Sequence, residues 1–87
     1  MHPPFFHADS DCVRFWVPIA GIAVGASVRR DVLHHRYAPH SVDEDPLATF
    51  QTNLGAIEDA VRRRVANGSI EPVMIREFDL KPGPAGS

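Results

Sequence analysis

The chain has 87 residues, of which 44% are hydrophobic, and its formal net charge is -2. A domain of this size buries only about 60% of the surface that its unfolded chain exposes, so the chain has room for one hydrophobic core and one domain. The small net charge gives no general attraction to nucleic acid or to an acidic membrane, and binding to either would require a local patch.

The single cysteine, Cys12, has no second cysteine with which to form an intramolecular disulfide. Disulfide-stabilised secreted scaffolds are therefore excluded, and a cytoplasmic location is predicted. The first residues lack the basic and continuous apolar segments of a secretory signal, and no stretch approaches the roughly 18 apolar residues of a membrane span. We expect residues 1–11 to be a partly ordered N-terminal segment, in which Phe5 and Phe6 either add a short fourth strand or cover an open edge of the core.

Apolar residues alternate with other types in two consecutive segments, residues 12–18 and 22–28. This period of two is typical of strands, and Ala20-Gly21 between the segments predicts a tight turn. We therefore expect an antiparallel hairpin. The side chains expected on its inner face are Val13, Phe15, Val17, Ile22, Val24, Ala26 and Val28.

Two helices are predicted after the hairpin. Residues 30–37 have helical spacing and end before Pro39. The strongest signal is a long amphipathic helix over residues 46–66, with Asp45 as N-cap, Pro46 at the first position and Asn67-Gly68 as the C-terminal stop. Its single apolar stripe consists of Leu47, Phe50, Leu54, Ile57, Val61 and Val65. Gly55 in its interior indicates a close contact or a mild bend.

A third strand is predicted from Ile70 to Leu80, with Val73 and Ile75 on one side and Met74, Arg76 and Phe78 on the other. Pro72 fits the start or an edge of this strand. The single domain then covers residues 12–80, and residues 81–87 form a flexible tail. The fold class is α+β: a two-layer, three-stranded or four-stranded, mainly antiparallel sheet with the short and the long helix on one face, in the order β-β-α-α-β.

This order of signals resembles a family of short bacterial proteins catalogued as a domain of unknown function, number fourteen-eighty-eight. The resemblance covers about residues 13–75. The residues that carry it are Phe15, Val17, Gly21, Val24, Val28, Leu33, Leu47, Phe50, Ile57, Glu58 and Ala60. It implies a compact α+β fold and no assigned activity, so it transfers no functional residues.

Catalytic and metal-binding functions find little support in the residue pattern. The five histidines do not have the spacing of a tetrahedral metal site, so no metal and no cofactor are predicted. Cys12 could act as a nucleophile with His34 or His35 as base, but no third orienting group is evident, and no catalytic residue is assigned. The run Arg62, Arg63 and Arg64 is better explained as a solvated helix end than as a phosphate site.

The sheet face away from the helices is the candidate functional surface. It would carry Trp16, Met74 and Phe78 in water, with Arg14 and Arg76 beside them. Exposed large apolar side chains usually mark a partner surface. We therefore predict a non-catalytic interaction module that forms a homodimer or docks an unknown protein. Two alternatives would remove this patch: the N-terminal segment covers the face, or the third strand has the other register. The alternative function is a nucleic-acid accessory protein that uses Arg14, Arg76 and the arginine run; a small enzyme or metal protein is less well supported.

Overall fold

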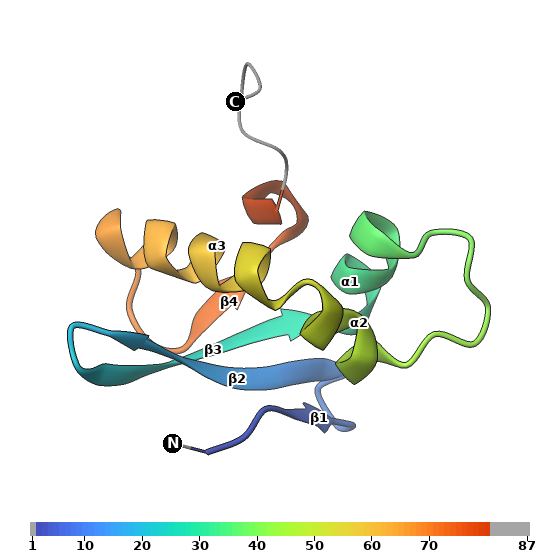
Figure 1. Ribbon diagram of the computed structural model, residues 1–87, viewed down its shortest axis with the longest axis horizontal. Helices are drawn as coiled ribbons and strands as arrows, with labels where there is room; N and C mark the ends of the chain where they lie inside the picture. Colours follow the sequence, from blue (N-terminus) through green and yellow to red (C-terminus); the bar gives the residue numbers. More distant parts are fainter. Residues whose placement is uncertain (1, 81–87) are drawn as a thin grey trace.

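The computed structural model describes residues 2–80, which form four strands, three α-helices and a short 3-10 helix (Figure 1). The predicted tail, residues 81–87, lies outside the described residues. The strands are β1 (Phe5–His7), β2 (Cys12–Ile19), β3 (Ile22–Arg29) and β4 (Val73–Ile75). The helical elements are α1 (Arg30–Tyr37), α2 (Pro46–Thr52), α3 (Leu54–Ala66) and the 3-10 helix η1 (Glu77–Leu80).

The strands form one mixed sheet in the order β1-β2-β3-β4. The β1–β2 and β2–β3 pairs are antiparallel, whereas β4 is parallel to β3. Phe5 and Phe6 thus belong to a fourth strand, which was one of the two predicted alternatives. The parallel pairing was not anticipated; it arises because the chain crosses over through all three α-helices before it returns beside β3.

The predicted hairpin of β2 and β3 is confirmed, with Trp16 opposite Gly25 and Ile19 opposite Ile22. Its two turn residues both have positive φ, 52° at Ala20 and 80° at Gly21. This combination is that of a type I′ turn, whose twist matches the twist of the flanking strands. The left-handed conformation is ordinary for Gly21 and costs free energy at Ala20, which has a Cβ.

All three α-helices lie on the same face of the sheet (Figure 1). The core between the two layers contains Phe15 packed against Phe50, with ring centroids 4.7 Å apart and the rings tilted by 49°. The other core residues include Val13, Val17, Val28, Leu33, Ile57, Ala60, Val61, Val73, Ile75 and Leu80. The sequence pattern therefore identified the inner face of β2 and β4 correctly.

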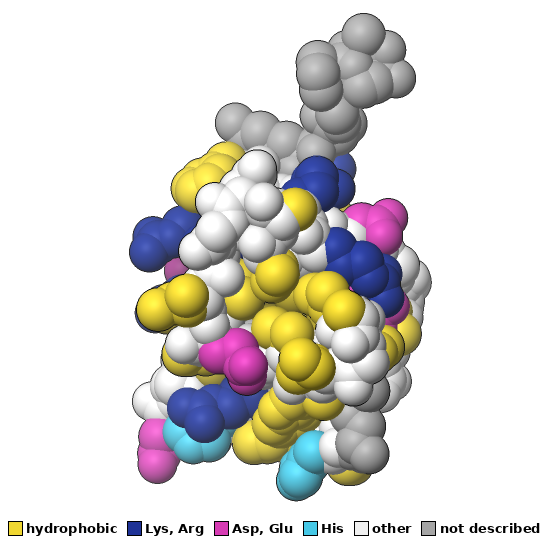
Figure 2. Space-filling model, turned by 90° about the vertical axis from the view of Figure 1, so that its left-hand side faces the viewer, with side chains coloured by type: hydrophobic (Ala, Val, Ile, Leu, Met, Phe, Trp, Pro, Cys, Tyr) yellow, Lys and Arg dark blue, Asp and Glu magenta, His cyan; other side chains and the backbone are white. Residues whose placement is uncertain are grey.

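The prediction that Ile22 belongs to the buried inner face of the hairpin was wrong. Ile22 shares that face with Val24 and Val28, but it lies at the hairpin tip and is 63% exposed. The hairpin extends beyond the helical layer, as Figure 1 shows. Figure 2 looks onto this end of the molecule and shows hydrophobic side chains gathered at the surface.

The long helix predicted over residues 46–66 is in fact two helices, with a break at Asn53. The start is as predicted, since Asp45 caps α2 by accepting a hydrogen bond from the Leu47 N–H at 3.1 Å. At the break, the Asn53 side-chain amide donates to the Thr49 carbonyl at 2.9 Å, and Asn53 leaves helical geometry with φ of -112° and ψ of 23°. Asparagine favours such local hydrogen bonds over a continuous helix. The bend therefore lies at Asn53 rather than at Gly55.

The predicted strand over residues 70–80 is also shorter than expected. Val73 and Ile75 point inward and Met74 outward, as predicted, but β4 ends at Ile75. The Asp79 carboxylate accepts a hydrogen bond from the Arg76 N–H at 2.9 Å, and the Asp79 N–H donates to the Arg76 carbonyl at 3.0 Å. This reciprocal pair turns the chain into η1, so Phe78 lies on a helical turn and not on a strand.

Among residues 2–80, none of the helices combines the length and the apolar composition that a membrane crossing requires.

Candidate functional site

The sheet face away from the helices carries a shallow groove of about 390 Å³. The strand register places Trp16 beside Gly25 and Ser27 beside Met74, so side chains from three strands share this face. The lining residues include Arg14, Trp16, Gly25, Ser27, Arg29 and Met74. Small residues on β3 form its floor, because neither glycine nor serine raises a bulky side chain between Trp16 and Met74.

The N-terminal segment partly covers Trp16. The His2 and Phe5 rings lie 4.9 Å and 6.2 Å from the indole, measured between centroids. Successive side chains of β1 point to opposite faces, so Phe6 packs against the core while Phe5 joins the open face. Trp16 is therefore half-buried. The predicted alternative, in which the N-terminal segment covers this face, is thus correct for the region around the indole.

Gly25 gives Glu71 access to the edge of β3. The Gly25 N–H donates to the Glu71 carboxylate at 2.9 Å. A Cβ at this position would lie 3.1 Å from that same oxygen and 3.5 Å from the Trp16 indole nitrogen. A larger residue would require the Glu71 side chain to shift slightly, so Gly25 allows the carboxylate its close approach to the backbone.

A second hollow, of about 480 Å³, continues on the other side of Met74. It is lined by Arg29, Arg76 and Phe78 among others. Met74 is 50% exposed and Phe78 is 61% exposed. Of the five predicted interface residues, Arg14, Trp16 and Met74 line the first hollow, while Met74, Arg76 and Phe78 line the second.

The structure adds Arg29 to these five residues, since it lines both hollows. The sequence argument missed Arg29 because it lies at the junction of β3 and α1. The alternation of β3 could have indicated its side, because it follows Gly25 and Ser27 at a period of two.

The arginine run at the end of α3 mainly holds the C-terminal part of the domain. Arg64 donates to the Ser69 hydroxyl, the Met74 carbonyl and the Asp79 carboxylate, the last at 2.7 Å. Arg63 donates to the Asp79 carbonyl, whereas Arg62 faces Glu58 and Asp59 at 3.9 Å and 3.6 Å. The prediction of a solvated helix end therefore fits Arg62, whereas Arg63 and Arg64 bind the segment that follows the helix.

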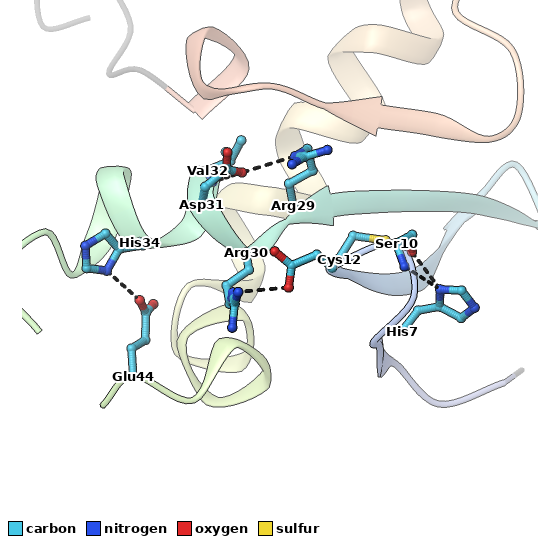
Figure 3. A network of polar contacts seen from close by, with 10 residues as sticks. His7, Ser10, Cys12, Arg29, Arg30, Asp31, Val32, His34 and Glu44 are labelled. Atoms are coloured by element: carbon cyan, nitrogen blue, oxygen red, sulfur yellow. Dashed lines mark hydrogen bonds and ion pairs between the residues drawn. The ribbon is translucent and has the colours of Figure 1, made fainter. Parts of the chain in front are cut away.

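Cys12 belongs to a polar chain with His7 and Ser10 at the β1–β2 turn (Figure 3). The Ser10 hydroxyl lies 2.6 Å from His7 Nδ1 and 3.0 Å from the Cys12 sulfur, and the Ser10 N–H also donates to His7 Nδ1. The imidazole connected to the thiol is therefore His7, and not His34 or His35 as the sequence suggested. The spacing of His7 and Cys12 across a short turn was the available signal, because a hairpin brings its two ends together.

His34 lies elsewhere, with its Nδ1 2.9 Å from the Glu44 carboxylate (Figure 3). The polar network also contains the pairs Arg29–Asp31 and Arg30–Asp11, at 3.2 Å and 3.1 Å. Within residues 2–80, no three side chains of histidine, cysteine, aspartate or glutamate are grouped so that they could hold a metal ion.

A family model described as a protein of unknown function (DUF1488) matches residues 2–75. Neither the comparison with curated proteins nor the comparison with solved structures finds a match.

Proposed function

The chain belongs to the DUF1488 family of proteins of unknown function, and we propose that it is a non-catalytic interaction module that self-associates through the open face of the sheet. The family description assigns no activity, so the proposal rests on the surface of the protein alone. The observation that carries this proposal is the apolar groove between Trp16 and Met74, on a face that none of the helices within residues 2–80 covers. Large apolar side chains grouped in water on a small protein usually mark a partner surface, and a two-fold dimer is the commonest use of one.

The charged residues of the open face support a second copy of this chain as the partner that binds the groove. The open face carries Arg14 and Arg29, which line the groove, together with Glu71 beside Gly25. A surface with both signs can be complementary to itself, because a two-fold axis can place the carboxylate of one copy against a guanidinium of the other.

On the β4 side of the sheet, capped backbone groups favour contact through the face rather than addition of another strand. Glu71 accepts the Gly25 N–H at the edge of β3, and Arg64 donates to the Met74 carbonyl on β4. Backbone groups that already have side-chain partners are poor templates for another strand. The association we propose therefore buries side chains of the groove and adds no strand beside β4.

Sedimentation velocity across the micromolar range tests this proposal. We expect the wild type to shift from monomer to dimer as its concentration rises, and Trp16→Ala to remain monomeric over the same range. Leu54→Ala is the matched control, because Leu54 is a partly exposed apolar residue on the helical layer. A wild type that stays monomeric at all concentrations would refute self-association, and the groove would then be expected to bind a different protein.

A second candidate is binding of single-stranded nucleic acid, for which the specific observation is that Arg14 and Arg29 line the same groove as Trp16. An aromatic ring for stacking flanked by guanidinium groups is the usual chemistry of such sites. Fluorescence anisotropy with a labelled oligonucleotide tests it: binding should weaken steeply with added salt and with Arg14→Ala. Absence of salt-sensitive binding would exclude this candidate.

A further inference from the structure

A third hollow lies on the helical side of the molecule, between the end of α1, the segment of residues 38–45 and α2. Its volume is about 280 Å³, several times the roughly 30 Å³ that one water molecule occupies in the liquid. The lining side chains that matter here are Tyr37, Ser41, Glu44, Asp45, Thr49 and Asn53. It is shallow, and it is separate from the open face of the sheet.

Glu44 has one carboxylate oxygen that the fold leaves without a partner. Its side chain is only 8% exposed, and Oε1 lies 2.9 Å from His34 Nδ1 (Figure 3). Its second oxygen, Oε2, is buried and has no hydrogen-bond partner within residues 2–80. A buried carboxylate oxygen without a donor is costly, so this position favours a group that supplies an N–H.

Tyr37 presents a second group of the same kind. Its hydroxyl is buried and also lacks a partner within residues 2–80, and the residue lines the same hollow as Glu44. Burial raises the pKa of the Tyr37 hydroxyl, an effect that Arg36 partly offsets. The hydroxyl therefore keeps its proton at neutral pH, and it can accept a hydrogen bond through its oxygen.

The charges around the hollow select the kind of ligand. Glu44 and Asp45 line it, and its lining contains no arginine or histidine. Glu44 also borders a neighbouring hollow with Arg30 and His34. Arg30 pairs with Asp11, and Arg36, next to Tyr37, donates to the Leu80 carbonyl at 2.8 Å. The hollow is therefore suited to a small cation that carries hydrogen-bond donors.

We propose that this hollow binds a primary ammonium group on a short aliphatic chain, with Glu44 Oε2 and the Tyr37 hydroxyl as the acceptors. A primary ammonium has three N–H donors, which suits two separate orphaned acceptors better than a single-donor cation does. Both acceptor atoms are buried, and both residues line the hollow, so the proposal requires that the side chains rotate to expose the acceptors to the ligand. The chain of the ligand then lies toward solvent, along Ala48 and Thr52.

Titration with propylammonium chloride, followed by backbone amide NMR, is the test. We expect saturable shifts at Tyr37, Glu44 and Thr49, and none with tetramethylammonium chloride, which has the charge but no N–H donor. Glu44→Gln should weaken the binding by about tenfold or more, because a hydrogen bond to a charged group is lost. Tyr37→Phe, which removes only the hydroxyl, should weaken it by a smaller factor.

Asp43→Asn is the matched control, because it removes one negative charge from an exposed neighbour that lines none of the hollows described above. It should leave the affinity within about twofold of the wild type, as expected for a screened surface charge. Equal losses in Asp43→Asn and Glu44→Gln, or equal shifts with the two ammonium salts, would overturn the proposal. If Glu44→Gln does not fold, Tyr37→Phe and the comparison of the two salts decide the question.

Discussion

Tyr37 shows how the surroundings of one side chain change its chemistry. It is the only tyrosine in the chain and lies at the end of α1, with the Arg36 guanidinium 5.4 Å from its ring centroid. Burial of its hydroxyl disfavours the charged phenolate and raises its pKa, and this effect outweighs the opposing influence of Arg36. Neither effect could be read from a tyrosine in a helical sequence pattern.

Alkaline titration tests this assignment directly. Because the folded state keeps the Tyr37 proton at pH values where the unfolded chain releases it, this group leaves the free energy of unfolding unchanged below about pH 10 and lowers it above. The absorbance of tyrosinate should rise with a midpoint above the ordinary value of about 10. With a single tyrosine the signal needs no deconvolution, and Tyr37→Phe should abolish both effects. A midpoint at or below the ordinary value would contradict the burial.

At the scale of elements, α3 and η1 depend on each other through arginine side chains. In the ion pair between Arg64 and Asp79, the Arg64 side chain is 28% exposed and the Asp79 side chain is 10% exposed. Arg64 also donates hydrogen bonds to the Ser69 hydroxyl and the Met74 carbonyl. Arg62, two residues earlier in the same run, is 43% exposed, and its carboxylate neighbours lie 3.6 Å and 3.9 Å away. Residues of one type in one run thus have different structural roles.

Two alanine substitutions separate these roles. Arg64→Ala should lower the free energy of unfolding by about 2 kcal/mol, because it leaves the Asp79 carboxylate and the Met74 carbonyl without their charged donor. Arg62→Ala should cost less than about 0.5 kcal/mol, as expected for an exposed ion pair. Urea denaturation followed by circular dichroism measures both. Equal costs would mean that the arginines contribute only through their general charge.

At the scale of the whole molecule, one face of the sheet is covered and the other is open. The helices bury Phe50 and Ile57 completely, but the break at Asn53 turns Leu54 away from the core, so that it is 38% exposed while Ala60 is buried. A straight helix would have placed Leu54 on the same stripe as Phe50 and Ile57. The break thus decides which apolar residues contribute to the core.

Truncation of these two residues should give clearly different costs. Ile57→Ala should reduce the free energy of unfolding by about 2–5 kcal/mol, because it creates a cavity in the interior. Leu54→Ala should cost less than about 1 kcal/mol, since most of what it removes is already in contact with water. A thermal or urea unfolding series measures the difference. A large cost for Leu54→Ala would indicate that α2 and α3 form one continuous helix in solution.

The local features could be predicted from the amino-acid pattern, because they depend on neighbours within a few residues. Alternation and periodicity predicted the hairpin, the helix over residues 30–37, the Asp45 cap, the stop at Asn67-Gly68 and the inward side chains of β4. The folded chain was needed to see the parallel pairing of β4, the turn at Asp79, the coverage of Trp16 by Phe5 and the oxygens of Glu44 and Tyr37 that have no partner within residues 2–80. These features join residues that are distant in the chain or depend on one side chain competing with the backbone for a hydrogen bond, and neither is expressed in a local pattern.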